Sequence, residues 1–182
     1  MAEPARTVAG FLNEAFTLFR SKDIAPAERW AKLRTLIERQ MDISALAKFT
    51  TGARLGQTAA AMQQHFRRLL ADYLVTAYGT MIEEAAETPY DIAVQNSPTD
   101  GTAVVTTIFR RTGSAPEPIS WHLRATNGAY RIVDVVGGGI SLAVTQRSVF
   151  QSVMQDGGLP ELIAKLEAHS HGFVDAANRE AN

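Results

Sequence analysis

The sequence RIVDVVGGGISLAVTQRSVF, residues 131–150, changes its pattern halfway along. It begins as an apolar, strand-like run, reaches Gly137, Gly138 and Gly139, and continues with apolar residues at helical spacing. Glycine tolerates positive φ, so consecutive glycines permit a sharp reversal between a strand and a helix. A phosphate-binding loop is the alternative, but the segment lacks both GxGxxG and a following GK[ST]. The glycines therefore predict a turn, with Ser141 as a candidate cap of the next helix.

One carboxylate, Asp134, lies inside the apolar part of this segment. Strand alternation places it on the same face as Ile132, which we expect to be the covered face. A buried carboxylate needs hydrogen-bond donors, and the amides of the glycine turn, the Ser141 hydroxyl or Arg147 could supply them. We therefore predict a structural latch made of Asp134, Gly139, Ser141 and Arg147, with a functional acid as the alternative.

The residues before this segment divide into helices and strands by their hydrophobic period. Apolar residues recur at helical spacing over 5–20, 26–41 and 62–82, and Asp42 is a candidate N-cap for a short helix in between. The period then changes to two. The predicted strands are 90–96, 102–111, 119–125 and 130–136.

Two dipeptides favour hairpin turns between these strands, Asp100-Gly101 after Pro98-Thr99 and Asn127-Gly128. After the meander the helical period returns, is interrupted at Gly157-Gly158 and resumes at Pro160. The order of helices, meander and helices predicts an α+β fold. A helical layer would cover one face of a curved antiparallel sheet of about four strands, with an NTF2-like or cystatin-like appearance.

Composition excludes several classes of function. A net charge of −1 argues against nucleic-acid binding, and the absence of cysteine excludes disulfides and cysteine metal sites. No apolar run reaches the roughly 18–20 residues of a membrane span. The four histidines are not in an HEXXH motif, and His169 and His171 do not share a helical face. We therefore predict no metal and no cofactor.

Three segments in order resemble the MlaC family of periplasmic lipid carriers. They are MDISALAKFTTG (41–52), FRRLLADYLVTAYGTMI (66–82) and the stretch 119–166. The most specific signatures are D-I-S-x-[IL]-A-[RK]-F at 42–49 and D-V-x-x-x-G-[IV]-S-L, which begins at Asp134 and is followed by R-S-x-F. We expect a single domain over 1–182, with the resemblance covering a core of about 8–168. The polar tail 169–182 carries no family motif and is expected to fray.

The resemblance implies a soluble periplasmic shuttle that is not an enzyme. It would hold the acyl chains of a phospholipid in an apolar cavity. Its partners would be an outer-membrane lipoprotein complex and an inner-membrane ABC transporter with its substrate-binding ring. The N-terminal sequence MAEPA is compatible with a signal peptide that has been removed.

The apolar residues of the predicted helices and strands are the candidates for the wall of this expected cavity. It comprises Trp30, Leu33, Phe66, Leu70, Tyr73, Leu74, Tyr78, Val105, Trp121, Leu123, Ile132, Ile140, Leu142 and Phe150.

Three alternatives remain open at the level of sequence. The cargo could be a hopanoid or another isoprenoid lipid, since the family includes hopanoid-associated members. An NTF2-like isomerase or dehydratase would use Asp134 or Asp72 as a base with His122 as its partner. An interaction protein with a solid core would have no cavity at all.

Overall fold

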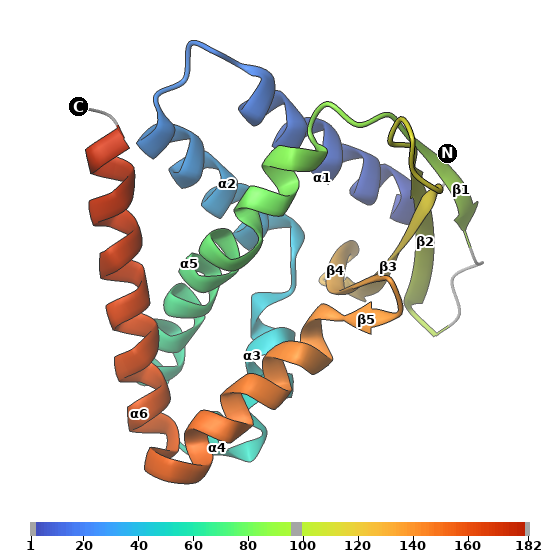
Figure 1. Cartoon of the computed structure of the whole chain (residues 1–182). Coiled ribbons are helices and arrows are strands. Elements are labelled where there is room, and N and C mark those ends of the chain that lie inside the picture. Colours follow the sequence, from blue (N-terminus) through green and yellow to red (C-terminus); the bar gives the residue numbers. More distant parts are fainter. Residues whose placement is uncertain (1–2, 96–99, 181–182) are drawn as a thin grey trace.

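The computed structural model describes residues 3–95 and 100–180, with side chains for 3–93 and 100–170. Within these ranges there are six helices and five strands, shown in Figure 1. The helices are α1 (Glu3–Arg20), α2 (Pro26–Gln40), α3 (Ile43–Thr51), α4 (Ala53–Gly56), α5 (Ala60–Ala85) and α6 (Leu142–Glu180). The strands are β1 (Tyr90–Gln95), β2 (Thr102–Phe109), β3 (Glu117–Thr126), β4 (Ala129–Gly137) and β5 (Ile140–Ser141). The predicted α+β class is confirmed.

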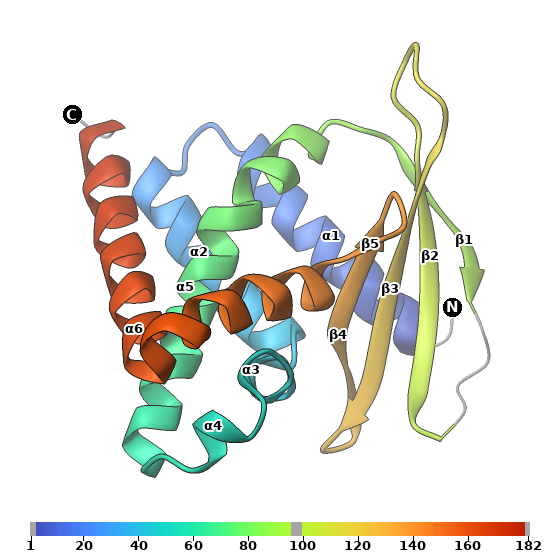
Figure 2. The same cartoon turned by 60° about the horizontal axis from the view of Figure 1, so that its bottom comes forward.

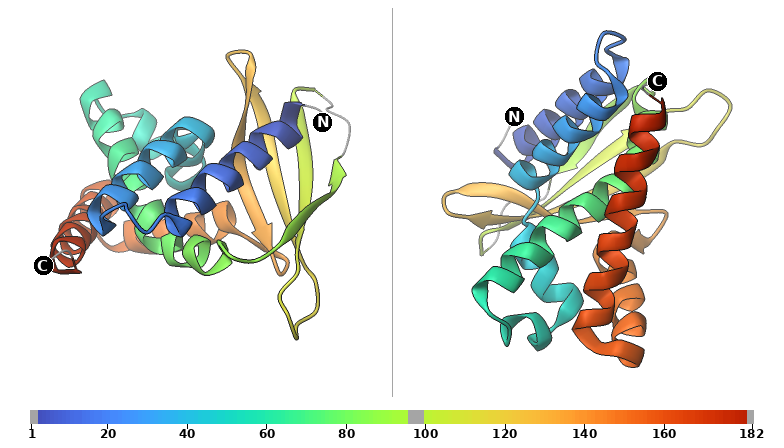
Figure 3. Two further views of the ribbon diagram at one scale, coloured as in Figure 1. Left: turned by 90° about the horizontal axis from the view of Figure 1, so that it is seen from above. Right: turned by 90° about the vertical axis from the view of Figure 1, so that its left-hand side faces the viewer.

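The sheet is an antiparallel meander in the order β1-β2-β3-β4-β5. Four strands match the predicted ones, and the two-residue β5 is additional. Asn127 and Gly128 both have positive φ, 52° and 81°, as a tight hairpin turn requires. The predicted turn before β2 lies partly outside the described residues, which resume at Asp100. Figures 2 and 3 show the helices on one side of the sheet.

The helices begin and end where local chemistry favours it. Asp42 caps α3 by accepting a hydrogen bond from the Ala45 amide at 2.9 Å, as predicted, and Gly52 ends this helix with φ 64°. The four-residue α4 was not predicted, because one turn is too short to display a helical period. In Figure 3, α1 lies along the inner face of the sheet. Its buried Phe16 contacts Phe109 of β2 at a ring distance of 6.2 Å.

Helix α6 changes direction at Gly158, whose φ of 68° and ψ of −162° interrupt the helix two residues before Pro160. The second half then runs beside α5, away from the sheet (Figure 1). Between these two helices His65 bonds to Glu167 at 2.7 Å and Thr76 bonds to His169. The predicted break at Gly157-Gly158 is therefore confirmed. The polar tail, expected to fray, is instead helical as far as Glu180.

Strand β4 contains an irregularity that reverses one prediction. Ile132 pairs with Leu123 and Asp134 pairs with His122, so Val133 is an extra residue without its own partner on β3. Such a bulge shifts the alternation of side chains by one. Asp134 therefore lies on the face of His122, opposite to Ile132. The predicted shared face was wrong because strict alternation assumes a strand without a bulge.

Asp134 nevertheless holds the start of α6. Its carboxylate accepts hydrogen bonds from the Ser141 hydroxyl at 2.6 Å and from the Ala143 amide at 2.9 Å. Ser141 in turn accepts from the Val144 amide at 3.0 Å and caps the helix. Gly138 and Gly139, with φ of 57° and 77°, form the tight turn between β4 and β5. Both carboxylate and hydroxyl satisfy amides that a helix N-terminus leaves without partners.

Arg147 is not part of this arrangement. Its guanidinium lies over the Phe49 ring at 5.0 Å from the centroid, which joins α6 to α3. The residues that hold the junction are thus Asp134, Gly139 and Ser141, and the prediction is wrong for Arg147.

Trp30 was predicted to line the cavity, but it packs between helices. Its ring contacts Phe19 at 5.5 Å and covers Gly79 of α5. A Cβ added at Gly79 would lie 2.1 Å from Cζ3 of Trp30, so α2 and α5 approach this closely only because residue 79 has no side chain.

Replacing Gly79 with Ala is expected to lower the free energy of unfolding by about 1–3 kcal/mol, because the indole must move. Gly10→Ala is the matched control, since nothing lies within 4 Å of its added Cβ and alanine favours a helix by about 1 kcal/mol. Urea unfolding of both variants measures the difference. Equal stability of the two variants would contradict the close approach.

Asp134→Ala is expected to destabilise the protein by about 1–3 kcal/mol, because it leaves the Ala143 amide and the Ser141 hydroxyl without their acceptor. Arg147→Ala removes one exposed cation–π contact and should cost less than about 1 kcal/mol. Thermal or urea unfolding distinguishes the two. An Asp134→Ala protein as stable as wild type would show that the junction does not depend on the carboxylate.

Candidate functional site

A cavity of about 370 Å³ lies between the inner face of the sheet and helices α1, α5 and α6. This volume falls within the roughly 300–1,000 Å³ of ligand pockets in proteins. The lining comprises Phe11, Leu12, Phe16, Ile37, Met41, Leu74, Tyr78, Met81, Ile82, Glu84, Ala85, Phe109, Arg111, Glu117, Ile119, Trp121, Ile132, Val135 and Leu142. Only three of these nineteen side chains are charged, so the wall is suited to hydrocarbon.

The sheet supplies one wall through the bulge in β4. Because Val133 is the extra residue, Ile132 and Val135 both face the cavity although they are three positions apart. Trp121 of β3 pairs with Val135 and is fixed by a hydrogen bond from its Nε1 to the buried Thr107 hydroxyl at 3.0 Å. The indole is thus held with its polar atom satisfied and its ring available to the cavity.

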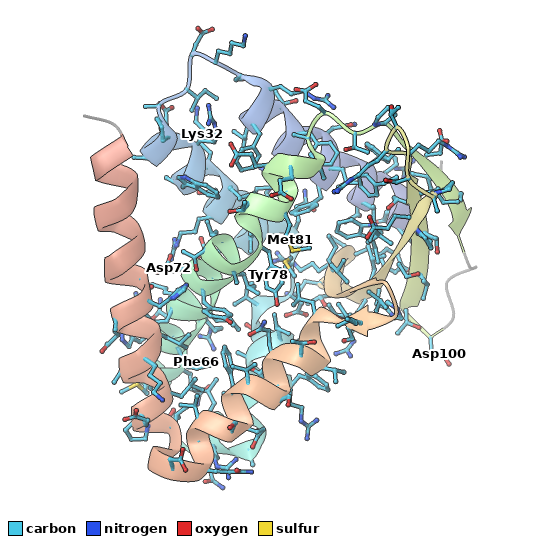
Figure 4. All side chains as sticks on the ribbon, viewed as in Figure 1. Lys32, Phe66, Asp72, Tyr78, Met81 and Asp100 are labelled. Atoms are coloured by element: carbon cyan, nitrogen blue, oxygen red, sulfur yellow. The ribbon has the colours of Figure 1, made fainter. Side chains whose placement is uncertain are left out.

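Helix α5 supplies the opposite wall. Leu74, Tyr78, Met81 and Ile82 recur at helical spacing and all line the cavity. Figure 4 shows Tyr78 and Met81 on the side of α5 nearer the sheet. Asp72 lies on another side of the helix, where it is paired with Arg34 of α2. Met81 is 63% exposed, so this part of the wall reaches the protein surface.

One polar contact interrupts the apolar wall. The Gln146 amide donates a hydrogen bond through Nε2 to the Tyr78 hydroxyl. Gln146 is buried, and in the described part of the chain its Oε1 has no hydrogen-bond partner. Burial raises the pKa of Tyr78 above the usual value for tyrosine, and the Gln146 hydrogen bond opposes that shift. Tyr78 therefore stays neutral over the physiological range.

The structure brings together five of the fourteen predicted wall residues. These are Leu74, Tyr78, Trp121, Ile132 and Leu142. Three others, Phe66, Tyr73 and Phe150, form a cluster of rings between α5 and α6 (Figure 4 labels Phe66). The remaining buried ones, Leu33, Leu70, Val105 and Leu123, belong to the solid core outside the cavity lining.

Ile140 is the clearest correction among the predicted wall residues. It is 67% exposed, because the turn at Gly138 and Gly139 leaves Ser141 directed toward Asp134 and Ile140 directed toward solvent. Its apolar character alone suggested burial. A two-residue strand gives no alternation from which its orientation could be read.

Several cavity residues were missed by the sequence analysis. Helix α1 contributes Phe11, Leu12 and Phe16, for which the sequence indicated only the apolar face of a helix. The end of α2 contributes Ile37 and the following Met41. Their periodicity indicated burial, but no sequence signal tells a residue in a packed core from one that faces an empty volume. Gln146 had no signal at all.

The charged residues of the lining lie at the cavity opening. Glu84 of α5, Arg111 after β2 and Glu117 at the start of β3 are all exposed, whereas most of the remaining lining is at least partly buried. Glu117 pairs with Phe109, and it continues the series of cavity-facing positions Ile119 and Trp121. We call these three exposed residues the charged lip of the cavity.

The groups that an isomerase would need are not in this cavity. Asp134 and His122 are neighbours across β3 and β4, but on the sheet face opposite to Trp121. The Asp134 carboxylate is already bonded to Ser141 and Ala143. Asp72 is paired with Arg34. None of these three side chains is among the residues that line the cavity.

Among the side chains of residues 3–93 and 100–170, no group of three or more His, Asp or Glu could hold a metal ion. Among residues 3–95 and 100–180, no helix is sufficiently long and apolar to cross a membrane.

Comparison with known proteins agrees with this geometry. No curated protein sequence matches the chain. The fold is similar to a solved structure of the phospholipid-binding protein from Ralstonia solanacearum in complex with a phospholipid. The TM-score is 0.79 at 15% sequence identity, and the match covers 94% of this chain and 98% of the other. At this identity the likeness concerns the fold.

The family comparison extends over most of the sequence. The description of the matching family is MlaC protein, and the match covers residues 11–168. These limits include the cavity, the junction at Asp134 and both halves of α6 except its end. The chain therefore belongs to the MlaC family, a family of non-enzymatic lipid-binding carriers.

Proposed function

We propose that this chain, acting as one lipid-binding domain, is a periplasmic carrier that holds the acyl chains of a phospholipid in the cavity between α5 and the sheet. The observation that supports this most directly is an apolar cavity of about 370 Å³ whose charged residues are confined to its opening. An amphiphile fits such a site with its tails inside and its headgroup at the lip. The Ralstonia protein of similar fold holds a phospholipid, which supports the proposal that this chain also binds one.

The energetics of such a carrier follow from transfer free energies. Moving a CH₂ group from water into an apolar cavity contributes about 0.8 kcal/mol, so a chain of ~16 carbons gains roughly 12 kcal/mol relative to water. A chain that leaves a bilayer gains almost nothing, because both environments are apolar. The protein would thus remove the aqueous barrier between two membranes without itself setting the direction of transport.

Direction would then come from the partners of the carrier. We propose that it exchanges lipid with an outer-membrane lipoprotein complex and with an inner-membrane ABC transporter and its substrate-binding ring, as the family relationship suggests. A hopanoid or another isoprenoid lipid is the second candidate cargo, since an apolar wall does not by itself require a straight chain.

The carrier proposal is tested by filling the cavity. Val135→Trp places a large ring where Val135 lines the cavity, and it should abolish or strongly reduce co-purifying lipid. Native mass spectrometry of protein purified from cells, with extraction of the lipid, measures both occupancy and lipid identity.

The matched control is Val104→Trp, because Val104 is on the outer face of β2, between the buried Ala103 and Val105. It should retain lipid at the wild-type level. Circular dichroism verifies that both variants are folded. A folded Val135→Trp protein with unchanged lipid content, or a wild-type protein that never carries lipid, would contradict the proposal.

Lipid in the cavity should also change the titration of Tyr78. Burial raises the pKa of both Tyr78 and Tyr90, but only Tyr78 lines the cavity. Hydrocarbon beside the hydroxyl removes further water, so loading should raise the pKa of Tyr78 and leave that of Tyr90 unchanged. Absorbance of tyrosinate against pH, with and without lipid, measures this, and Tyr78→Phe identifies the transition.

The same shift has a defined effect on stability. A tyrosine whose pKa is raised on folding stabilises the protein fully below the ordinary value of about 10, and that contribution is lost as pH rises above it. Wild type should therefore lose stability more steeply than Tyr78→Phe above about pH 10. If the pKa of Tyr78 were the same with and without lipid, the ligand would have to lie elsewhere.

A further inference from the structure

The three charged residues at the cavity opening have no partners in the described part of the chain. Neither Glu84, Arg111 nor Glu117 forms a hydrogen bond or ion pair through its side chain there, although all three line the same cavity. In Figures 1 and 2 the C-terminal end of α5 and the loop between β2 and β3 lie at the same end of the molecule. The opening thus presents one cation and two anions above an apolar interior.

The adjacent Arg110 differs from Arg111 in both its partner and its position. Arg110 donates a hydrogen bond to the Asp91 carboxylate at 3.0 Å and does not line the cavity. Successive residues of an extended chain point to opposite faces. Arg110, which is paired with Asp91, and Arg111, which lines the cavity, therefore point in opposite directions. The chain neutralises the arginine that faces away from the cavity and leaves the one beside it available.

Glu117 is at an inward position that is otherwise apolar along β3. It is on the cavity face with Ile119, Trp121 and Leu123, the last of which is almost completely buried. A carboxylate at such a position is stable only at the solvent edge or beside a cation. Glu84 lines the cavity from α5. Both carboxylates therefore line the cavity at exposed positions, where a positively charged group of a bound lipid could contact them.

We infer that this lip selects a zwitterionic phospholipid headgroup, with Arg111 binding the phosphate and Glu84 and Glu117 binding the ammonium group. The inference rests on the proposed function, because it assumes acyl chains in the cavity. A guanidinium binds phosphate through two parallel hydrogen bonds. A headgroup with only negative charge gains the contact with Arg111 but meets the repulsion of two carboxylates. The lip carries a net charge of −1, which favours the zwitterion.

The size of the preference is limited by solvent. All three side chains are exposed, and exposed ion pairs contribute about 0.2–1 kcal/mol each. Only the two carboxylate contacts distinguish the headgroups, because both lipids share the phosphate contact, and together they correspond to roughly a two- to thirtyfold preference. Most of the affinity would still come from the tails; Arg111 would add a small contact that both lipids share, and the two carboxylates would decide which of two lipids with equal tails is bound.

The experiment is a competition between two lipids with identical acyl chains. Delipidated protein is incubated with vesicles containing equal amounts of phosphatidylethanolamine and phosphatidylglycerol, and the bound ratio is measured by mass spectrometry. Wild type should bind phosphatidylethanolamine in roughly two- to thirtyfold excess. Glu84→Gln combined with Glu117→Gln should abolish or reverse the excess, because the ammonium site is lost while Arg111 remains.

Neighbouring residues provide controls with the same change of charge. Glu83→Gln alters an exposed glutamate beside Glu84 that does not line the cavity and should leave the ratio unchanged. Arg111→Gln should reduce the binding of both lipids, whereas Arg110→Gln should not. These pairs distinguish a local headgroup site from an effect of overall charge.

The possible outcomes distinguish the carrier function from the headgroup site. If neither lipid is bound, the carrier function itself is wrong. If both are bound equally, if phosphatidylglycerol is preferred, or if the ratio is the same in the double variant as in wild type, the carrier function remains and the headgroup site is refuted. A shift of equal size in Glu83→Gln and Glu84→Gln would also refute it.

Discussion

The extra residue in β4 is the constraint on which the rest of the molecule depends. Without Val133 as a bulge, Ile132 and Asp134 would share a face, and a carboxylate would enter the apolar cavity. With it, Val135 joins Ile132 on the cavity wall and Asp134 faces away, where it holds the first turn of α6. One backbone irregularity thus keeps the interior apolar and also fixes the helix that forms one of its sides.

Two clusters of aromatic rings form or border the wall of the cavity. One lies between α1 and the sheet, where Phe16 contacts Phe109. The other lies between α5 and α6, where Phe66 and Tyr73 both contact Phe150. Buried aromatic rings contribute much of the apolar area that stabilises a small domain.

The sequence predicts those features that have a local physical cause. The long helix α5, the hairpin at Asn127-Gly128 and the cap at Asp42 follow from periodicity, positive φ and side-chain acceptors. Features that depend on tertiary arrangement were not predictable. The bulge at Val133 has no local signature, and the outward direction of Ile140 depends on a two-residue strand. The resemblance to the MlaC family indicated a cavity, but only the three-dimensional structure distinguishes wall residues from those of the solid core.

The distribution of polarity over the cavity bears on how a carrier could release what it binds. Apolar contacts hold a hydrocarbon chain about as well as a bilayer does, so they favour neither capture nor release. Inside the lining, the Tyr78–Gln146 contact is the main departure from this uniformity, and Gln146 itself is buried behind the wall. Groups that can discriminate are instead placed at the exposed opening, where water weakens each contact. Selectivity of this kind changes the choice of cargo by a small factor without making any cargo too tightly bound to leave. A carrier that must give up its lipid to a partner protein is better served by weak contacts at the opening than by strong ones inside.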